Sequence, residues 1–506
     1  MKRVAFLVDN PYRDLPGLIL VAMRLCSEGT TCYLVPMNLM ESELSSLEVD
    51  FILLSCLRTK NEAFVKKLQE AGVQVGVLDV EGGVYTPAAV EMTEEESTQK
   101  NTIGSLAGIK QYALTMASDP HVRGNVSRFF SWGTQFAEYA SQVGWYRSDQ
   151  IAVTGVPRFD FYAPPWRSAS LRVTNHAEGV KEPVVLLNAS FPLANPSRED
   201  PEWQKVHVMK YFSYRREYLD RLHALQKEAM AGLVVLANTL ARNFPEVSFV
   251  FRPHPFEKSD TYRALLEPHP NLHLIQYGTV DGWLLRAKTM IMWNSSTAIE
   301  AGLAGIPTLF PTWIAKYLPV PTVEAASIPC ASKESLFEML RAILEGRFEP
   351  PKPLREKFEI MVKGWFYEID GRSHQRVASE ILKCLEYSQG NGSRSLSLKR
   401  VLEPRLEENG ALRGKVASRL RKFLGLPSHW SLRHWGPLIE HQWMDYAGKF
   451  FDEQSVRVWT EVLYEESRSD AALQLKPVRV ERVQHRVRLG NRCWGRTVVL
   501  SPAGGK

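Results

Sequence analysis

The chain has 506 residues, of which 44% are hydrophobic and 23% are charged, and it carries a formal net charge of +6 at pH 7. This length exceeds what a single hydrophobic core organises, so we expect two large domains and an appendage. The composition is that of a folded globular protein, and so small a net charge does not indicate a nucleic-acid partner.

The six cysteines are scattered and form no C-x-x-C pair, which favours a reducing compartment over a disulfide framework or a zinc site. The first apolar run, at 4–8, is too short for a signal peptide. No apolar stretch approaches the roughly 18 residues needed to cross a bilayer. We therefore expect a cytoplasmic protein that meets a membrane, if at all, at its inner face.

Short apolar runs alternate with helical segments in the first third of the chain. We predict strands at 4–8, 31–36, 49–55, 73–79, 128–132 and 150–155, and helices at 18–28, 61–71, 103–117 and 134–143. This alternation predicts a parallel, doubly wound sheet.

The stretch 164–183 is polar and has no periodicity, so we predict an interdomain linker there. The alternating pattern then resumes. Strands are predicted at 184–190, 247–251, 271–276, 289–294 and 307–311, and helices at 213–243, from Thr297, at 333–345 and at 354–386. The fold class is therefore α/β. Two Rossmann-like domains (1–165 and 183–345) face a central cleft, and a helical tail (346–388) and a basic extension of unknown role (389–506) follow them.

In open parallel sheets, ligands bind beyond the carboxyl ends of the strands. The segment FVFRPHP (249–255) ends a strand with Arg252 and His254, each followed by a proline. Rigid presentation of an arginine fork and an imidazole suits a phosphate or diphosphate. The alternative is a rigid turn whose histidine caps a carbonyl. The second His-Pro pair, at His269, precedes its strand and is expected to be only a turn.

A second candidate lies in WNSSTAIEAGLAGIPT (293–308), where a strand gives way to a helix. Ser295, Ser296 and Thr297 begin that helix, whose free N–H groups form an anion site. Glu300 could hold a ribose diol, as acidic residues do in nucleotide-binding folds. The alternative is a Ser/Thr-x-x-Glu capping box, and the two interpretations are compatible.

Three further segments follow predicted strands of the first domain. Glu81 precedes Gly82-Gly83 and is a candidate general base, or else a solvated turn carboxylate. Arg13 and Asp14 lie in the first loop, NPYRDLPG (10–17), where they contact an acceptor or pair with each other. That loop lacks G-x-G-x-x-G, which argues against NAD. Arg158 follows another strand and is expected to pair with Asp160 at a hinge.

Several motifs are absent from the sequence. It contains no Walker A, no G-x-S-x-G, no H-E-x-x-H and no Asp-x-Asp. The usual way of holding a divalent ion against a sugar diphosphate is therefore lacking. We expect a mechanism without metal or other cofactor, in which positive side chains and a helix N-terminus stabilise the leaving phosphate.

Taken together, the segments described above resemble those of the GT-B glycosyltransferases of bacterial surface carbohydrate synthesis. FRPHP, the Ser-Ser-Thr…Glu helix start and FSWGTQFAEYA…IAVTGVPRFDFY carry the resemblance, which covers about residues 1–386. The chain is similar to the surface carbohydrate biosynthesis proteins, whose relatives include polysialyltransferase-like, capsule Kdo-transferase and CDP-glycerol glycerophosphotransferase enzymes.

The resemblance implies roles for the candidate residues. Residues 1–165 would form the acceptor domain and 183–345 the nucleotide-donor domain. His254, Ser295 and Ser296 would bind the donor phosphate, and Glu81 would act as the base. The family's acidic-acidic-glycine motif reads Val80-Glu81-Gly82 here, so only its second acid is present. Donors in this group are often cytidine-activated, which implies a CMP-linked sugar as one candidate.

The C-terminal extension contains a basic amphipathic segment at 410–426, GALRGKVASRLRKFLGL. It suits anionic headgroups near a lipid-linked glycan, or else it docks on the second domain with its charges in water. A β-hairpin is predicted at 478–494, around Gly490-Asn491.

These observations predict a metal-independent glycosyltransferase that moves a sugar from a nucleotide to a surface polysaccharide or glycolipid. Glu81 would deprotonate the acceptor hydroxyl, while Arg252, His254 and residues 295–297 hold the departing phosphate. Two alternatives remain: a nucleotide-sugar 2-epimerase or hydrolase of the same fold, and a non-catalytic sugar-binding subunit of a polysaccharide assembly complex.

Overall fold

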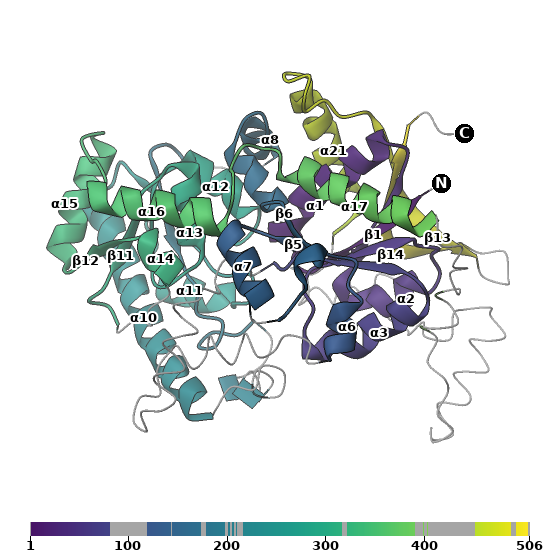
Figure 1. Ribbon diagram of the computed structural model, residues 1–506. Coiled ribbons are helices and arrows are strands. Elements are labelled where there is room, and N and C mark those ends of the chain that lie inside the picture. Colours follow the sequence, from purple (N-terminus) through teal and green to yellow (C-terminus); the bar gives the residue numbers. More distant parts are fainter. Residues whose placement is uncertain are drawn as a thin grey trace.

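The computed structural model describes residues 2–80, 119–142, 144–173, 179–197, 216–315, 321–389, 451–486 and 492–503, with a few positions between 201 and 209 and at 398 and 402. Two sheets, each flanked by helices, lie side by side (Figure 1). Glu81, the predicted helix at 103–117 and the basic segment 410–426 lie outside the described residues.

The first sheet has the strand order β13-β14-β2-β1-β3-β4-β5-β6. Strands β1 to β6 run parallel, and most apolar side chains of β1 to β5 are buried because helices cover the sheet. The predicted strands of this domain are confirmed at β1 (Arg3–Val8), β2 (Thr31–Pro36), β3 (Phe51–Leu54), β4 (Gln74–Val77), β5 (Arg128–Ser131) and β6 (Ile151–Val153).

The helices and short turns of this domain connect its strands. They are α1 (Pro11–Ser27), η1 (Met37–Leu39), α2 (Met40–Leu44), η2 (Thr59–Asn61), α3 (Glu62–Glu70), α6 (Pro120–Gly124), α7 (Thr134–Gln142), η4 (Ser148–Gln150) and η5 (Pro157–Tyr162).

Helix α1 begins earlier than the sequence analysis predicted. The Asn10 side chain accepts a hydrogen bond from the Tyr12 backbone N–H at 3.1 Å, and Pro11 occupies the first helical position. An asparagine cap followed by proline is a strong helix start, so the loop predicted at 10–17 is wrong beyond residue 10. Arg13 and Asp14 therefore lie in the first turn of a helix.

The second sheet is also parallel, with the order β12-β11-β10-β7-β8-β9. Its strands are β7 (Val184–Asn188), β8 (Ser248–Arg252), β9 (Leu272–Leu274), β10 (Ala287–Met292), β11 (Thr308–Pro311) and β12 (Ile328–Cys330). Its helices are α10 (Arg216–Asn243), α11 (Ser259–Leu265), α12 (Val280–Arg286), α13 (Thr297–Ala304), α14 (Pro321–Ala325) and α15 (Lys333–Leu344). Read from its own first strand, this is the Rossmann order 3-2-1-4-5-6.

The predicted linker contains a helix, α8 (Trp166–Val173). Trp166 is fully buried, and its indole N–H donates to the Gly371 carbonyl at 2.8 Å. The prediction of a linker without a helix is therefore wrong. Helix α8 is too short to show a helical repeat in the sequence, and it is held in place by the buried Trp166 ring.

The helical tail crosses between the domains as two helices, α16 (Lys352–Trp365) and α17 (Ser373–Gln389). Figure 1 shows α16 beside the second domain and α17 beside α1 of the first. Asp160 anchors α17 by accepting from the backbone N–H groups of Ser373 and His374 at 2.9 and 2.8 Å. It also pairs with the His374 imidazole at 2.8 Å. The expected Arg158–Asp160 ion pair is therefore wrong.

Part of the C-terminal extension belongs to the first domain. Strands β13 (Val478–Arg486) and β14 (Arg492–Pro502) form the predicted hairpin, and β14 pairs antiparallel with β2. Figure 1 shows the hairpin at the edge of the first sheet. Helix α21 (Glu453–Ser467) packs against α8 and α1. In the described part of the chain, no helix combines the length and apolarity needed to cross a membrane.

Candidate active site

A cleft of about 260 Å³ lies between the two domains. It is bounded by residues just beyond the carboxyl ends of strands from both sheets. In the second domain its floor lies at the switch point between β7 and β10, where the strand order reverses, and open α/β sheets bind ligands there. The cleft contains residues of both segments that were predicted to bind phosphate, Arg252–His254 and Ser295–Thr297.

Arg252 lines the cleft, but its guanidinium is directed into the protein. It donates to the carbonyls of Tyr277, at 2.8 Å, and of Gly278. Burial lowers the pKa of Arg252 to about 10, and the nearby Asp281 carboxylate partly opposes this effect. The prediction of a guanidinium aimed at a ligand is not met by these two N–H groups, which hold the segment that follows β9.

His254 is half-buried and its orientation is set by the turn that follows it. The Phe256 backbone N–H donates to His254 Nδ1 at 3.2 Å. A neutral imidazole with Nδ1 as acceptor carries its proton on Nε2. The backbone carbonyl of His254 also accepts from the Gln276 amide at 2.8 Å and from the Glu257 N–H at 2.9 Å. The turn therefore fixes both the backbone and the tautomer.

A buried carboxyl group lies behind this turn. Glu257 accepts hydrogen bonds from the Phe191 backbone N–H and from the Tyr262 hydroxyl, and it so joins the loops that follow β7 and β8. Burial raises the pKa of Glu257 to about 7. The sequence analysis missed this residue, although it lies only three positions after His254.

The N-terminus of α13 faces the same cleft. Asn294 adopts a positive φ of 47°, which turns the chain from β10 into the helix. Ser295 Oγ accepts from the Asn188 amide at 3.1 Å and from the Thr297 N–H at 3.3 Å. Ser296 is exposed, and its hydroxyl caps no backbone N–H. Ser295, Ser296 and Thr297 all line the cleft, and buried Ser295 also shapes the helix start.

Glu300 does not form the capping box that was considered as an alternative. Its carboxylate lies 3.5 Å from Arg158 Nε, an ion pair that bridges the two domains. Burial raises the pKa of Glu300, while Arg158 and Arg13 oppose the shift. Burial also lowers the pKa of Arg158, which Glu300 opposes.

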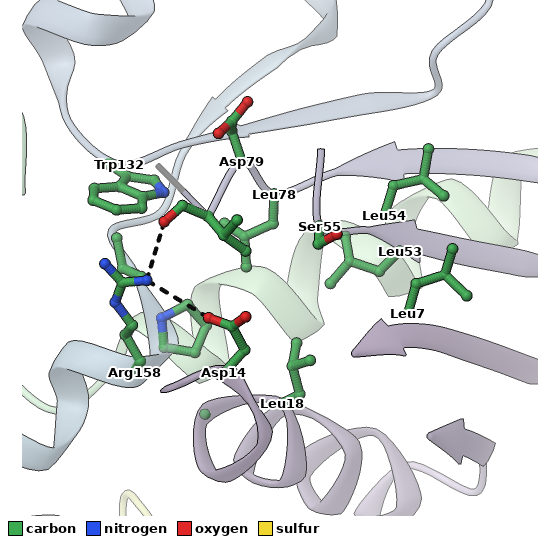
Figure 2. A pocket seen from close by; sticks show the side chains of 14 residues that line it. Leu7, Asp14, Leu18, Leu53, Leu54, Ser55, Leu78, Asp79, Trp132 and Arg158 are labelled. Atoms are coloured by element: carbon green, nitrogen blue, oxygen red, sulfur yellow. Dashed lines mark hydrogen bonds and ion pairs between the residues drawn. The ribbon is translucent and has the colours of Figure 1, made fainter. Parts of the chain in front are cut away.

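Arg158 is the central cation on the first-domain side. Its guanidinium carbon lies 4.9 Å from the Trp132 ring centroid and 5.0 Å from that of Phe159. Nη1 donates to the Val80 carbonyl at 3.1 Å and lies 3.6 Å from Asp14 (Figure 2). Arg13 in turn donates to Asp14 at 2.8 Å, so the pairing of these two neighbours that the sequence analysis considered does form.

Glu81 is outside the described residues, but Val80, which precedes it, lines the cleft. Other lining residues were missed: Asn188, Trp132, Tyr12 and Phe366. Asn188 is the last residue of β7 and Trp132 directly follows β5, so the rule about strand ends could have found them. Phe366 comes from the tail and has no comparable sequence signal. Among the described residues, no group of three or more His, Cys, Asp or Glu side chains is arranged to hold a metal ion.

No protein-family model matches the chain, and no curated protein matches it either. Solved structures with a similar fold include the wall teichoic acid polymerase TagF, at 13% identity over 77% of this chain and 89% of that one, with a TM-score of 0.47. They also include S. aureus MnaA with UDP (14%, 76% and 97%, TM-score 0.44). A third is the UDP-GlcNAc 2-epimerase of Neisseria meningitidis with UDP-GlcNAc (14%, 76% and 100%, TM-score 0.41).

The two facing α/β domains are established by the sheets and the cleft of this chain itself. Similarity at this level carries no information on substrate or reaction.

Proposed function

We propose that the protein is a GT-B glycosyltransferase that moves a sugar from a nucleotide-activated donor to a surface polysaccharide or glycolipid acceptor, without a metal ion. The observation that supports this most is the convergence of the His254 turn and the α13 N-terminus on one interdomain cleft. An imidazole N–H donor, a hydroxyl pair and a helix N-terminus together suit an anionic leaving group.

In this proposal the nucleotide phosphate binds between His254 and residues 296–297. The Nε2 proton of His254 and the hydroxyls of Ser296 and Thr297 donate to phosphate oxygens, and the N-terminus of α13 adds the positive end of its helix dipole. Arg252 acts as a positioning residue, because it holds the backbone of Tyr277 and Gly278 beside the cleft.

The acceptor hydroxyl would approach from the first domain. Glu81 is proposed as its base, which receives the proton as the hydroxyl oxygen attacks the anomeric carbon and the bond to phosphate breaks. Val80 brings the chain into the cleft immediately before Glu81, which supports this assignment. Arg13 and Arg158 lie on the same side and are proposed to bind charged or hydroxyl groups of the substrates.

Thermal-shift measurements with CMP, CDP, UDP and GDP test the proposal. A nucleotide that binds only the folded protein adds about 2.7 kcal/mol at 100 times its Kd. We expect at least one of the four to raise the Tm of the wild type and to do so much less in His254→Ala. If none of them binds at millimolar concentration, the proposal is wrong.

Product analysis distinguishes the transferase from the two alternatives. A transferase releases nucleotide rapidly only when acceptor is added, whereas a hydrolase does so at full rate without it, and a 2-epimerase yields an isomeric nucleotide sugar. A folded His254→Ala protein that supports glycan synthesis as well as wild type would favour the non-catalytic role.

A further inference from the structure

A second, much smaller cavity of about 30 Å³ opens beside the interdomain cleft. It lies at the carboxyl ends of β1, β3 and β4, against helix α1. Strands β1 and β3 flank the position where the order of the first sheet reverses, so this cavity occupies the switch point of the first domain just as the cleft occupies that of the second.

Most residues of the cavity wall are apolar, and five of them are leucines. Figure 2 shows Leu7, Leu18, Leu53, Leu54 and Leu78 around it. All five are buried. A water molecule against these leucines would find few hydrogen-bond partners, so this part of the space favours an apolar group.

The polar groups of the wall already have partners within the protein. Asp79 forms a two-pronged ion pair with Arg58, and both side chains are buried. Ser55 Oγ donates to the sulfur of Met37 at 3.3 Å. The cavity therefore selects for an apolar group and disfavours a hydroxyl, which would be desolvated without compensation.

The cavity adjoins the interdomain cleft. Val80, Trp132 and Arg158 line both. The Arg158 guanidinium sits at the junction, bonded to the Val80 carbonyl and close to Asp14. A ligand in the cleft can thus place one small substituent in the cavity while its polar groups remain at this junction.

We propose that this cavity receives a methyl group of the sugar in the cleft, either the methyl of an N-acetyl group or the C6 methyl of a 6-deoxy sugar. The inference rests on the proposed function, and it names the substrate class. A space for one water needs 10–15 Å³ on this measure, so about 30 Å³ suits a methyl group but not a ring or chain. Burying one such group raises affinity by about fourfold or more.

Matched pairs of nucleotide sugars that differ in this group provide the test. The pairs are UDP-N-acetylglucosamine against UDP-N-formylglucosamine, CMP-N-acetylneuraminate against CMP-N-formylneuraminate, and GDP-rhamnose against GDP-mannose. Kd values from calorimetry give a methyl preference within each pair. We expect a preference of at least about fourfold for the wild type in either the N-acetyl pairs or the 6-deoxy pair, which identifies the source of the methyl.

Two substitutions change the cavity in opposite directions. Val156→Ile adds one methylene to a lining residue and should reduce the preference to near unity with little change in Tm. Leu18→Val removes one methylene from the wall and should improve the affinity for UDP-N-propionylglucosamine relative to UDP-N-acetylglucosamine. Leu20→Val makes the same change in the same helix away from the cavity and should leave both ratios at wild-type values.

If Val156→Ile does not fold, Leu18→Val with its Leu20→Val control carries the test alone. Binding of nucleotide sugars with no methyl preference, or with a preference that neither cavity substitution alters, would show that the space is only a packing void. Absence of binding by every nucleotide and nucleotide sugar would instead overturn the proposed function itself.

Discussion

The tautomer of His254 makes it the most direct single-residue test of the cleft. Since Nδ1 accepts from the Phe256 N–H, Nε2 is the protonated nitrogen, in place to donate to a phosphate oxygen. We expect His254→Ala to lower kcat/KM for sugar transfer by at least about 100-fold, within the range for a positioned proton donor. The side chain is only half-buried, so the Tm should change little.

His269 provides the matched control, since it is also followed by proline. It lies before β9 and pairs with Glu267 at 3.0 Å, away from the cleft. His269→Ala should retain wild-type kcat/KM. Equal losses in the two variants would mean that the effect belongs to the His-Pro turn in general and not to the cleft.

Glu257 makes stability depend on pH. Burial raises its pKa from 4.5 to about 7, so between these values the folded protein holds a proton that the unfolded chain releases. The free energy of unfolding should therefore fall as pH rises from about 4.5 to about 7, by about 3 kcal/mol at most. Urea unfolding of wild type and Glu257→Gln across this range measures the difference.

Glu257→Gln removes the titrating group while keeping a hydrogen-bonding amide, so its slope between pH 4.5 and 7 should be shallower. Burial also raises the pKa of Asp281 to about 7, but Asp281 is present in both proteins and cancels in the comparison. Glu338→Gln, on an exposed position of α15, should keep the wild-type slope. Identical slopes for all three proteins would contradict the assignment.

For single residues, the sequence predicted which side chains line the cleft better than it predicted what each side chain contacts. The rule that functional side chains follow strand ends identified Arg252, His254 and Arg158, all of which line the cleft. It could not foresee that Arg252 bonds to the backbone of Tyr277 and Gly278, because those partners come from a different strand connection. Pairing across the fold is invisible in a local pattern.

Among the elements, two serine helix starts differ in what their side chains do. Ser332 accepts from the Ser335 N–H at 3.2 Å and caps α15, whereas Ser296 caps nothing and lines the cleft. We expect Ser296→Ala to weaken nucleotide binding by roughly tenfold, the effect of one hydrogen bond to a charged group, without loss of stability. Calorimetry and thermal unfolding measure the two effects.

Ser332→Ala is the reciprocal control. It should lower the free energy of unfolding by about 1 kcal/mol, the usual cost of losing an N-cap, and leave nucleotide affinity unchanged. If Ser296→Ala instead destabilises the protein and binds nucleotide normally, Ser296 serves only the helix.

Elements with a strong apolar pattern were predicted correctly, whereas helices that depend on one or two tertiary contacts were not. Strands such as β1 and β8 are continuous apolar runs, so their type is clear from composition alone. Helix α8 depends on the burial of Trp166, and α12 (Val280–Arg286) similarly buries Trp283. Neither is long enough to show a helical repeat.

At the scale of the whole molecule, several contacts join the two domains. The Arg158–Glu300 ion pair joins the domains at the cleft, and Ser170 of α8 donates to Asp281 of α12 beside it. Helix α21 also packs on α8, through Arg172 with Glu465 and Glu466. Helix α8 thus contacts both α12 of the second domain and α21 of the C-terminal extension. The described part of the extension is therefore not a separate module.

The clearest prediction at this scale concerns the hairpin β13–β14. Leu500 and Val498 are buried next to Cys32 and Leu34 of β2. The buried Glu43 carboxylate accepts from the Thr497 hydroxyl at 2.8 Å and from the N–H groups of Arg496 and Thr497. Removal of residues 478–506 would expose the apolar edge of β2 and leave a buried charge without these donors.

We therefore expect the truncated chain to aggregate or to lose cooperative unfolding, as judged by soluble yield, size-exclusion chromatography and thermal melts. Leu500→Asp should reproduce the defect with a single change, whereas Glu481→Ala, at an exposed position of the same hairpin, should behave as wild type. A soluble truncated chain that melts cooperatively at the wild-type temperature would instead support the prediction from sequence that the C-terminal residues are an appendage. Aggregation of the truncated chain, together with wild-type behaviour of Glu481→Ala, would show that the first domain is complete only when β13 and β14 join its sheet.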